Sequence, residues 1–404
     1  MPYDSIPSRA SLKPEPFNAH VPDLQLEGLK FLLRVSPIGP QTYENQVANA
    51  EDYTSFGISR NWLEEAKDHW INKYDWRKTE DRINSFNNWT VDIEEDGFMH
   101  NIHFVGVFSK KANAVPLLLL HGWPGSFLEF LGVVDEFTSK YNEDSLPFHL
   151  IIPSLPGYGY SNGPPTDKNF TTEGIARVMD KLMIGLGFES GYVTQGGDIG
   201  SFVSRVLGAT SSACKAVHLN MCIGVAPESQ EEVKNMNEKQ QKGLQRMKDF
   251  GSMGDSYARM HGTRPSTIGL VLSSSPIALL AWIGEKFIQW TDTNPPLDEI
   301  LDSVTLYWFT KSFPRAIYGY RQFFSPMPQF FHNDAEYYIK KPLGYSWHPE
   351  ELAPTPVPLV AKTGNLVWHR EHDEGGHFAA MEKPKQFAQD MEDFIGQVWN
   401  SSKL

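Results

Sequence analysis

Asp198 lies in a segment that could present a carboxylate for chemistry. Residues 192–200 read Tyr-Val-Thr-Gln-Gly-Gly-Asp-Ile-Gly, which predicts a strand, a Gly-x-Asp-x-Gly turn and then a helix. Gly196 and Gly200 leave room for a sharp turn that lifts the side chain clear of the backbone. A carboxylate that attacks an ester carbonyl forms a reactive anhydride, whereas attack on a saturated carbon forms a stable ester. The segment therefore favours displacement at an sp³ carbon with a strained or good leaving group, such as an epoxide or a halide.

Asp198 alone leaves an ordinary turn aspartate open, because Gly-Asp-x-Gly is common in loops. Two further segments supply the context. The sequence His-Gly-Trp-Pro-Gly-Ser at 121–126 follows an apolar run at 115–120, so it lies at the end of a buried strand where backbone N–H groups can bind an oxyanion. His377 lies in Glu-Gly-Gly-His-Phe at 374–378, shortly before the last predicted helix. A nucleophile that precedes the histidine in the chain is typical of the α/β-hydrolases.

These motifs resemble those of epoxide hydrolases of the microsomal type, especially the soluble fungal members. The segments 62–78, 264–269 and 312–317 extend the resemblance over nearly the whole chain. It implies an α/β fold, namely an α/β-hydrolase core with a mostly parallel, doubly wound sheet, an inserted helical cap and an N-terminal extension. It also implies that a small apolar epoxide and water form a vicinal diol through an aspartyl glycol monoester, with no cofactor.

The resemblance gives four residues a part in forming and hydrolysing that ester. An aspartate is ionised at neutral pH, so Asp198 needs no base to attack an oxirane carbon. His377 would then take a proton from water, which attacks the ester carbonyl. The backbone N–H groups of Trp123 and Ile199 would stabilise the resulting oxyanion.

Two tyrosines match the proton donors that the family carries in its cap. They are Tyr257 and Tyr320, and a phenol is neutral at pH 7 and can donate to the epoxide oxygen. The alternative for any tyrosine is an ordinary packed side chain. Tyr318 competes with Tyr320, but two residues apart on a helix they cannot both point at one oxygen.

The acid that orients His377 is expected between the cap and the histidine. The segment Pro-Glu-Glu-Leu at 349–352 occupies this stretch, and we choose Glu351, with Glu350 as the alternative. Its expected role is to hold the histidine tautomer and stabilise the imidazolium.

Composition limits which classes of partner and which metal or disulfide sites are expected. The chain has 404 residues, is 40% hydrophobic and 21% charged, and carries a net charge of −13, which excludes a basic surface for nucleic acid. Its two cysteines, Cys214 and Cys222, exclude a disulfide framework and are expected to be buried. The histidine pairs at i,i+3 spacing lack a third ligand, so no metal site is expected.

Four parts are predicted along the chain. They are an N-terminal extension (1–100), the first part of the core (101–226), the helical cap (227–340) and the second part of the core (341–404). The first thirty residues are expected to be an extended arm, followed by a helix at 58–74. Core strands are predicted at 101–107, 115–120, 148–153, 192–196, 216–221 and 357–362. Helices are expected from about 126, 172 and 199, within 228–248, 268–290 and 297–324 of the cap, and at 384–399.

Two other functions stay open from sequence alone. A haloalkane dehalogenase also uses an aspartate at this turn, but it commonly holds the halide with a tryptophan directly after the nucleophile, where this chain has Ile199. A non-catalytic member of the fold that binds a ligand is the second alternative, because a fold does not prove a function.

Location and assembly are expectations from short signals. The sequence shows neither a secretory signal nor an apolar stretch of roughly 18 residues, so no membrane span is expected. A C-terminal Ser402-Lys403-Leu404 predicts recognition by the peroxisomal import receptor, with the cytoplasm as the alternative. A homodimer, the preferred epoxide and the preferred enantiomer are left open.

Overall fold

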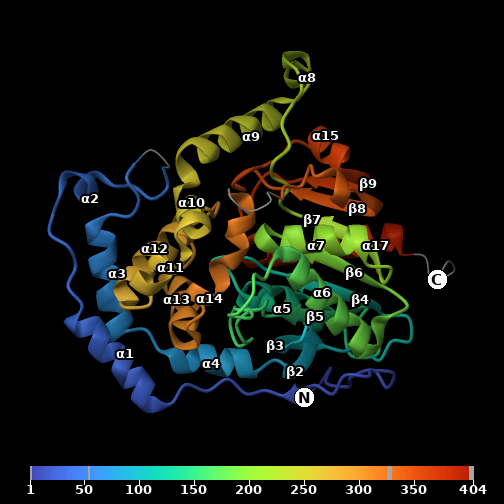
Figure 1. Cartoon of the computed structure of the whole chain (residues 1–404), viewed down its shortest axis with the longest axis horizontal. Coiled ribbons are helices and arrows are strands. Elements are labelled where there is room, and N and C mark those ends of the chain that lie inside the picture. The colour runs from blue at the N-terminus through green and yellow to red at the C-terminus, as the bar shows by residue number, and fades with distance from the viewer. Residues whose placement is uncertain (1, 53–54, 325–329, 400–404) are drawn as a thin grey trace.

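The computed structural model describes residues 2–52, 55–324 and 330–399, and its centre is one nine-stranded sheet (Figure 1). The strand order is β1-β2-β3-β5-β4-β6-β7-β8-β9. The first three strands and β5 pair antiparallel, and every pairing from β5 through β4 to β9 is parallel. The strands are β1 (Glu15–Pro16), β2 (Asn88–Glu95), β3 (Phe98–Val107), β4 (Val115–Leu120), β5 (Phe148–Pro153), β6 (Tyr192–Gly196), β7 (Cys214–Leu219), β8 (Ile339–Trp347) and β9 (Gly364–Glu371).

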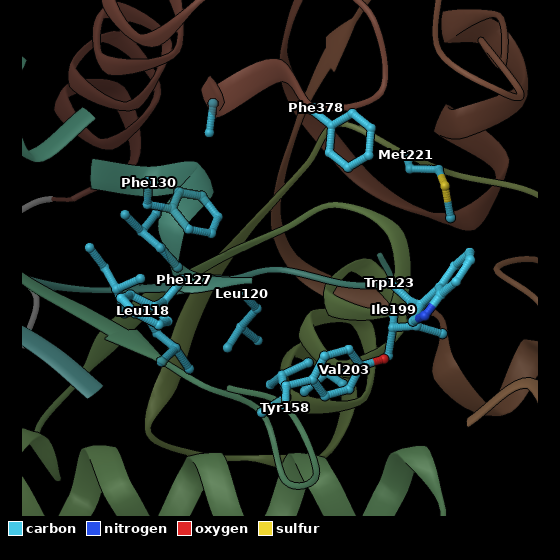
Figure 2. Packing of buried hydrophobic residues seen from close by; sticks show 14 of the residues in the cluster. Leu118, Leu120, Trp123, Phe127, Phe130, Tyr158, Ile199, Val203, Met221 and Phe378 are labelled. Atoms are coloured by element: carbon cyan, nitrogen blue, oxygen red, sulfur yellow. The ribbon is translucent and has the colours of Figure 1, made fainter. Parts of the chain in front are cut away.

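Helices cover the sheet because the parallel strands need crossover connections. Among them, α6 packs against α7, and α5 packs against α17. Figure 2 shows apolar side chains gathered between β4 and α7, among them Leu118, Leu120 and Val203, all of which are buried. The helices of the core are α5 (Leu131–Lys140), α6 (Thr172–Met183), α7 (Asp198–Thr210), α15 (Val357–Val360), α16 (Ala379–Glu382) and α17 (Pro384–Val398). This arrangement confirms the predicted α/β-hydrolase fold class.

In the described part of the chain, seven α-helices between β7 and β8 form the cap. They are α8 (Gln230–Lys234), α9 (Glu238–Asp249), α10 (Ser256–Thr263), α11 (Pro265–Leu272), α12 (Pro276–Gln289), α13 (Leu297–Thr310) and α14 (Phe313–Ala316), followed by the 3₁₀ turn η4 (Ile317–Phe323). The N-terminal extension lies along the outside of this cap (Figure 1). Its helices α1 (Asp23–Val35) and α3 (Arg60–Asn72) pack against α12, and α4 (Trp76–Asn84) packs against α13; the short α2 (Tyr43–Val47) packs against α3.

Three local predictions are wrong. The run 268–290 is not one helix, because Pro276 starts a new helix and the two segments meet at a bend of 116°. The run 357–362 is helical, since prolines 356 and 358 fit the start of a helix, and the strand follows as β9. The first thirty residues are not extended throughout, because α1 begins at Asp23.

The structure does not test two of the expectations from sequence. The boundaries of the four predicted parts stay a prediction. Ser402 to Leu404 lie outside the described residues, so the import signal also stays a prediction. Among the described helices, none is by itself long and apolar enough to cross a bilayer; α11 and α12 meet that test only when counted together across their bend.

Candidate active site

Asp198 stands at a strained turn between β6 and α7. Its φ is +44°, in the left-handed region that non-glycine residues rarely adopt. The turn is so tight that a Cβ at Gly196 would overlap the carbonyl of Gly200, and a Cβ at Gly200 would overlap the carbonyl of Leu120. The backbone therefore projects the Asp198 carboxylate at the carboxyl end of the parallel strands, where such sheets place their reactive groups.

The loop after β4 lies against this carboxylate. The backbone N–H of Trp123 donates a hydrogen bond to Asp198 Oδ1 at 2.7 Å. A Cβ at Gly122 would overlap the same carboxylate, so only glycine allows this close approach. Ile199 follows Asp198 directly, in the first turn of α7. The Trp123 N–H is thus directed at the nucleophile position, and a role for the Ile199 N–H stays a prediction.

His377 links Asp198 to Glu351. Its Nε2 lies 3.5 Å from Asp198 Oδ2, and its Nδ1 lies 2.6 Å from Glu351 Oε1. The Glu351 side chain is completely buried. Glu350 instead turns outward, with 42% of its side chain exposed, and pairs with Arg246 at 2.6 Å. Of the two glutamates that the sequence left open, the structure brings Glu351 to the histidine.

Charge controls the protonation of His377. Burial favours the neutral imidazole, but the carboxylates of Glu351 and Asp198 outweigh it and raise the His377 pKa well above the ordinary value. The histidine is therefore protonated while both carboxylates are charged.

The cap holds the loop that carries His377. The backbone N–H of His377 donates to the carbonyl of Trp290 at 2.8 Å, and the backbone N–H of Gly375 donates to Asp292 Oδ2 at 3.0 Å. The carboxylate of Glu382 in α16 accepts the Asp292 N–H at 2.7 Å. Gly375 has φ of +102°, a conformation that glycine adopts without strain. Cap and core backbone therefore fix this histidine jointly.

Tyr257 from α10 and Tyr320 from η4 face each other across the cap side of the site. Their ring centroids are 5.8 Å apart. The Tyr320 hydroxyl is buried and interacts with the side chain of Tyr257. Burial, followed by the charges of Tyr257 and Asp198, raises the pKa of Tyr320 well above its ordinary value, so the phenol stays protonated. Tyr318 points elsewhere and donates to the carbonyl of Pro156 at 2.9 Å.

Asp198, Tyr257 and Tyr320 line one cavity of about 360 Å³. It is large enough for a small organic molecule. Apart from Asp198 and the two tyrosines, most of its lining is apolar, with Ile199, Phe202, Met221, Ile223, Phe250, Phe323, Phe324, Phe331 and Leu352. Asp255 and Arg259 also line it, so a ligand would meet the Asp198 carboxylate, two phenols, this pair of charged residues and otherwise hydrocarbon walls.

Comparison with known proteins assigns the family. Residues 14–130 match the family model described as the epoxide hydrolase N terminus, and residues 115–303 match that of the alpha/beta hydrolase fold. A putative epoxide hydrolase of Dothistroma septosporum is 41% identical over 97% of this chain and 92% of its own length. The chain belongs to the epoxide hydrolase family.

Two more relatives agree with this assignment. Epoxide hydrolase 1 of Oryctolagus cuniculus is 30% identical over 85% of this chain and 81% of its own length. The solved structure of Aspergillus niger epoxide hydrolase superposes with a TM-score of 0.92 at 50% identity, covering 99% of this chain and 100% of that one.

In this epoxide hydrolase, sequence reasoning missed Glu129. The lining of a small cavity of about 20 Å³ includes Glu129, His377, Gln195 and Asp198; among the described residues, Asp198 is the one that also lines the larger cavity. This volume suits one water molecule. Burial raises the pKa of Glu129 to about 8, with the His377 charge opposing this shift and the Asp198 charge adding to it, so Glu129 is mostly protonated at pH 7.

The signal for Glu129 was present in the sequence as a capping box. Ser126 and Glu129 are spaced Ser-x-x-Glu, and the Glu129 carboxyl accepts the Ser126 N–H at 3.0 Å. The motif predicts the start of a helix, and only the fold shows that the same carboxyl reaches the cavity beside His377.

Proposed function

We propose that this protein hydrolyses small apolar epoxides to vicinal diols through a covalent ester on Asp198. The observation that carries the proposal is the single cavity in which Asp198 meets two phenols, Tyr257 and Tyr320. A carboxylate nucleophile and neutral proton donors on one apolar cavity suit the opening of an oxirane, whose oxygen leaves as an alkoxide.

In the first step an Asp198 oxygen attacks one oxirane carbon. The carbon–oxygen bond of the ring breaks, and its electron pair stays on the ring oxygen. Tyr257 and Tyr320 donate hydrogen bonds to this oxygen, and one of them supplies its proton. The product is a glycol monoester of Asp198.

Ester formation itself prepares His377 for the second step. The ester carries no charge, so one of the two carboxylates that hold His377 protonated is lost, and the pKa of His377 falls. The proton that His377 releases restores the phenol that protonated the epoxide oxygen. The neutral imidazole can then take a proton from water in the small cavity as that water attacks the ester carbonyl. The Trp123 N–H, already directed at Asp198 Oδ1, stabilises the oxyanion until the diol leaves.

A single turnover in heavy-oxygen water tests the covalent route. The first diol should contain only ordinary oxygen, because Asp198 supplies its second oxygen, and the label should stay in the enzyme. Label in the first diol would mean direct attack by water and would overturn the proposal. The Asp198→Ala variant should lose turnover.

A substrate screen tests the reaction class. Aryl and alkyl oxides, with chiral analysis of the diols, should yield diol with at least one class. Release of bromide from bromoalkanes without any diol from epoxides would instead favour the dehalogenase alternative, and ligand binding without turnover would favour the non-catalytic one.

A further inference from the structure

Lys286 of α12 is a buried cation that the proposed mechanism does not use. The residue is 5% exposed, and within the described part of the chain its ammonium group pairs with the neighbouring Glu285. The ammonium also lies over three rings, 4.9 Å from the centroid of Tyr257 and 5.8 Å from those of Trp282 and Trp290. These distances are typical of cation–π interactions.

The position of this ammonium is costly without a compensating partner. Lysine is rarely buried, because its charge loses hydration. Burial lowers the pKa of Lys286, and the Glu285 carboxylate opposes this effect. His261 of α10 lies near the same rings, and burial followed by the Lys286 charge lowers its pKa well below the ordinary value, so it is neutral. These contacts therefore identify Lys286 as the cation on the cap side of Tyr257.

The Tyr257 ring connects this cation to the reacting atoms. The ring stacks on Trp123, with centroids 5.3 Å apart and an interplanar angle of 18°, and Trp123 supplies the N–H to Asp198. Tyr257 also lines the cavity with Asp198. When a phenol gives its proton to an alkoxide, negative charge spreads from its oxygen into the ring. A nearby cation attracts a charged ring much more strongly than a neutral one.

We propose that Lys286 is a positioning residue that stabilises the negative charge left on Tyr257 when the epoxide oxygen takes its proton. The inference rests on the proposed function. Since the charge on Tyr257 exists only during and after ring opening, the Lys286 ammonium stabilises that transition state more than the resting enzyme. It also distinguishes the two tyrosines, because these cation–π contacts include Tyr257 and not Tyr320.

Two neutral replacements test the role of the charge. Lys286→Met keeps the length of the side chain, and Lys286→Gln keeps a hydrogen bond to Glu285, so the pair guards against failure of one variant to fold. Ester formation, followed by rapid quench and intact mass, should slow about tenfold, which is about 1.4 kcal/mol. Ester hydrolysis should be unchanged, and Lys286→Arg should restore most of the rate. Lys362→Met, which removes an equal charge paired with Glu228 and Glu232, is the matched control.

The Tyr257→Phe background shows whether the charge acts through the phenol. Without a hydroxyl no phenolate forms, so the Lys286 replacements should cause no further slowing there. A tenfold loss in both backgrounds, or an unchanged rate of ester formation in both neutral variants, would overturn the inference. A native enzyme that forms no ester with any epoxide would instead overturn the proposed function.

Discussion

Replacement of Glu351 by glutamine should stall the enzyme at the ester. The carboxylate lies 2.6 Å from His377 Nδ1 and is completely buried, so water cannot take over its role. A hydrogen bond to a charged group contributes about 1.5–3 kcal/mol, which corresponds to a loss of about 10- to 150-fold. Ring opening does not require His377 as a base, and we expect that step to change far less. The ester should therefore accumulate and be visible by intact mass.

The pH dependence of the same variant has a defined sign. Because Glu351 raises the pKa of His377, its neutralisation lowers that pKa, and the remaining hydrolysis should persist to lower pH than in the native enzyme. Glu350→Gln is the matched control, since the adjacent carboxylate is 42% exposed and pairs with Arg246. It should change either rate by less than about twofold, as expected for an exposed pair. Native ester hydrolysis in Glu351→Gln, or a stall in Glu350→Gln, would refute this reasoning.

Four other variants test the rest of the site. His377→Gln should still form the ester on Asp198 and then stop, and a fast second turnover would exclude His377 as the base. Tyr320→Phe should slow ring opening at least tenfold, whereas Tyr318→Phe should not, because that hydroxyl is bonded to a backbone carbonyl; equal rates in the two variants would contradict this assignment. The native Glu129 pKa of about 8 predicts that the stability of Glu129→Gln relative to the native enzyme increases as pH rises from 4.5 to 8, because the charged carboxylate is disfavoured in its buried position; urea unfolding measures this difference.

Sequence predicted the parallel core well because its strands are short and fully buried. The runs 115–120, 148–153 and 192–196 coincide with β4, β5 and β6, since each apolar run ends at turn residues. An apolar run of similar length at 357–362 is a helix, and its prolines decided the outcome. Short apolar runs leave strand and helix ambiguous, and the local backbone chemistry settles them.

The site was predictable where a motif combined residue type with chain context. Asp198, His377 and the Trp123 loop carry such motifs, and the structure brings them together. Glu129 carries only a helix-capping motif and Lys286 carries none, because the surroundings that matter come from segments distant in sequence. Lys286 reads as one more charge on a helix, and only the packing of α12 against α10 and the core places it over a tyrosine ring. Such long-range juxtapositions cannot be read from spacing.

The backbone bond between His377 and Trp290 has a mechanical consequence for ester hydrolysis. His377, the residue that must activate water, is hydrogen-bonded to the cap. The helices α1, α3 and α4 of the N-terminal extension pack against the outer side of that cap. Lifting the cap would break this bond and withdraw the base from the ester. The part of the cap that holds His377 therefore acts as a fixed wall of the active site. Hydrolysis of the ester thus requires the cap to stay in contact with the core.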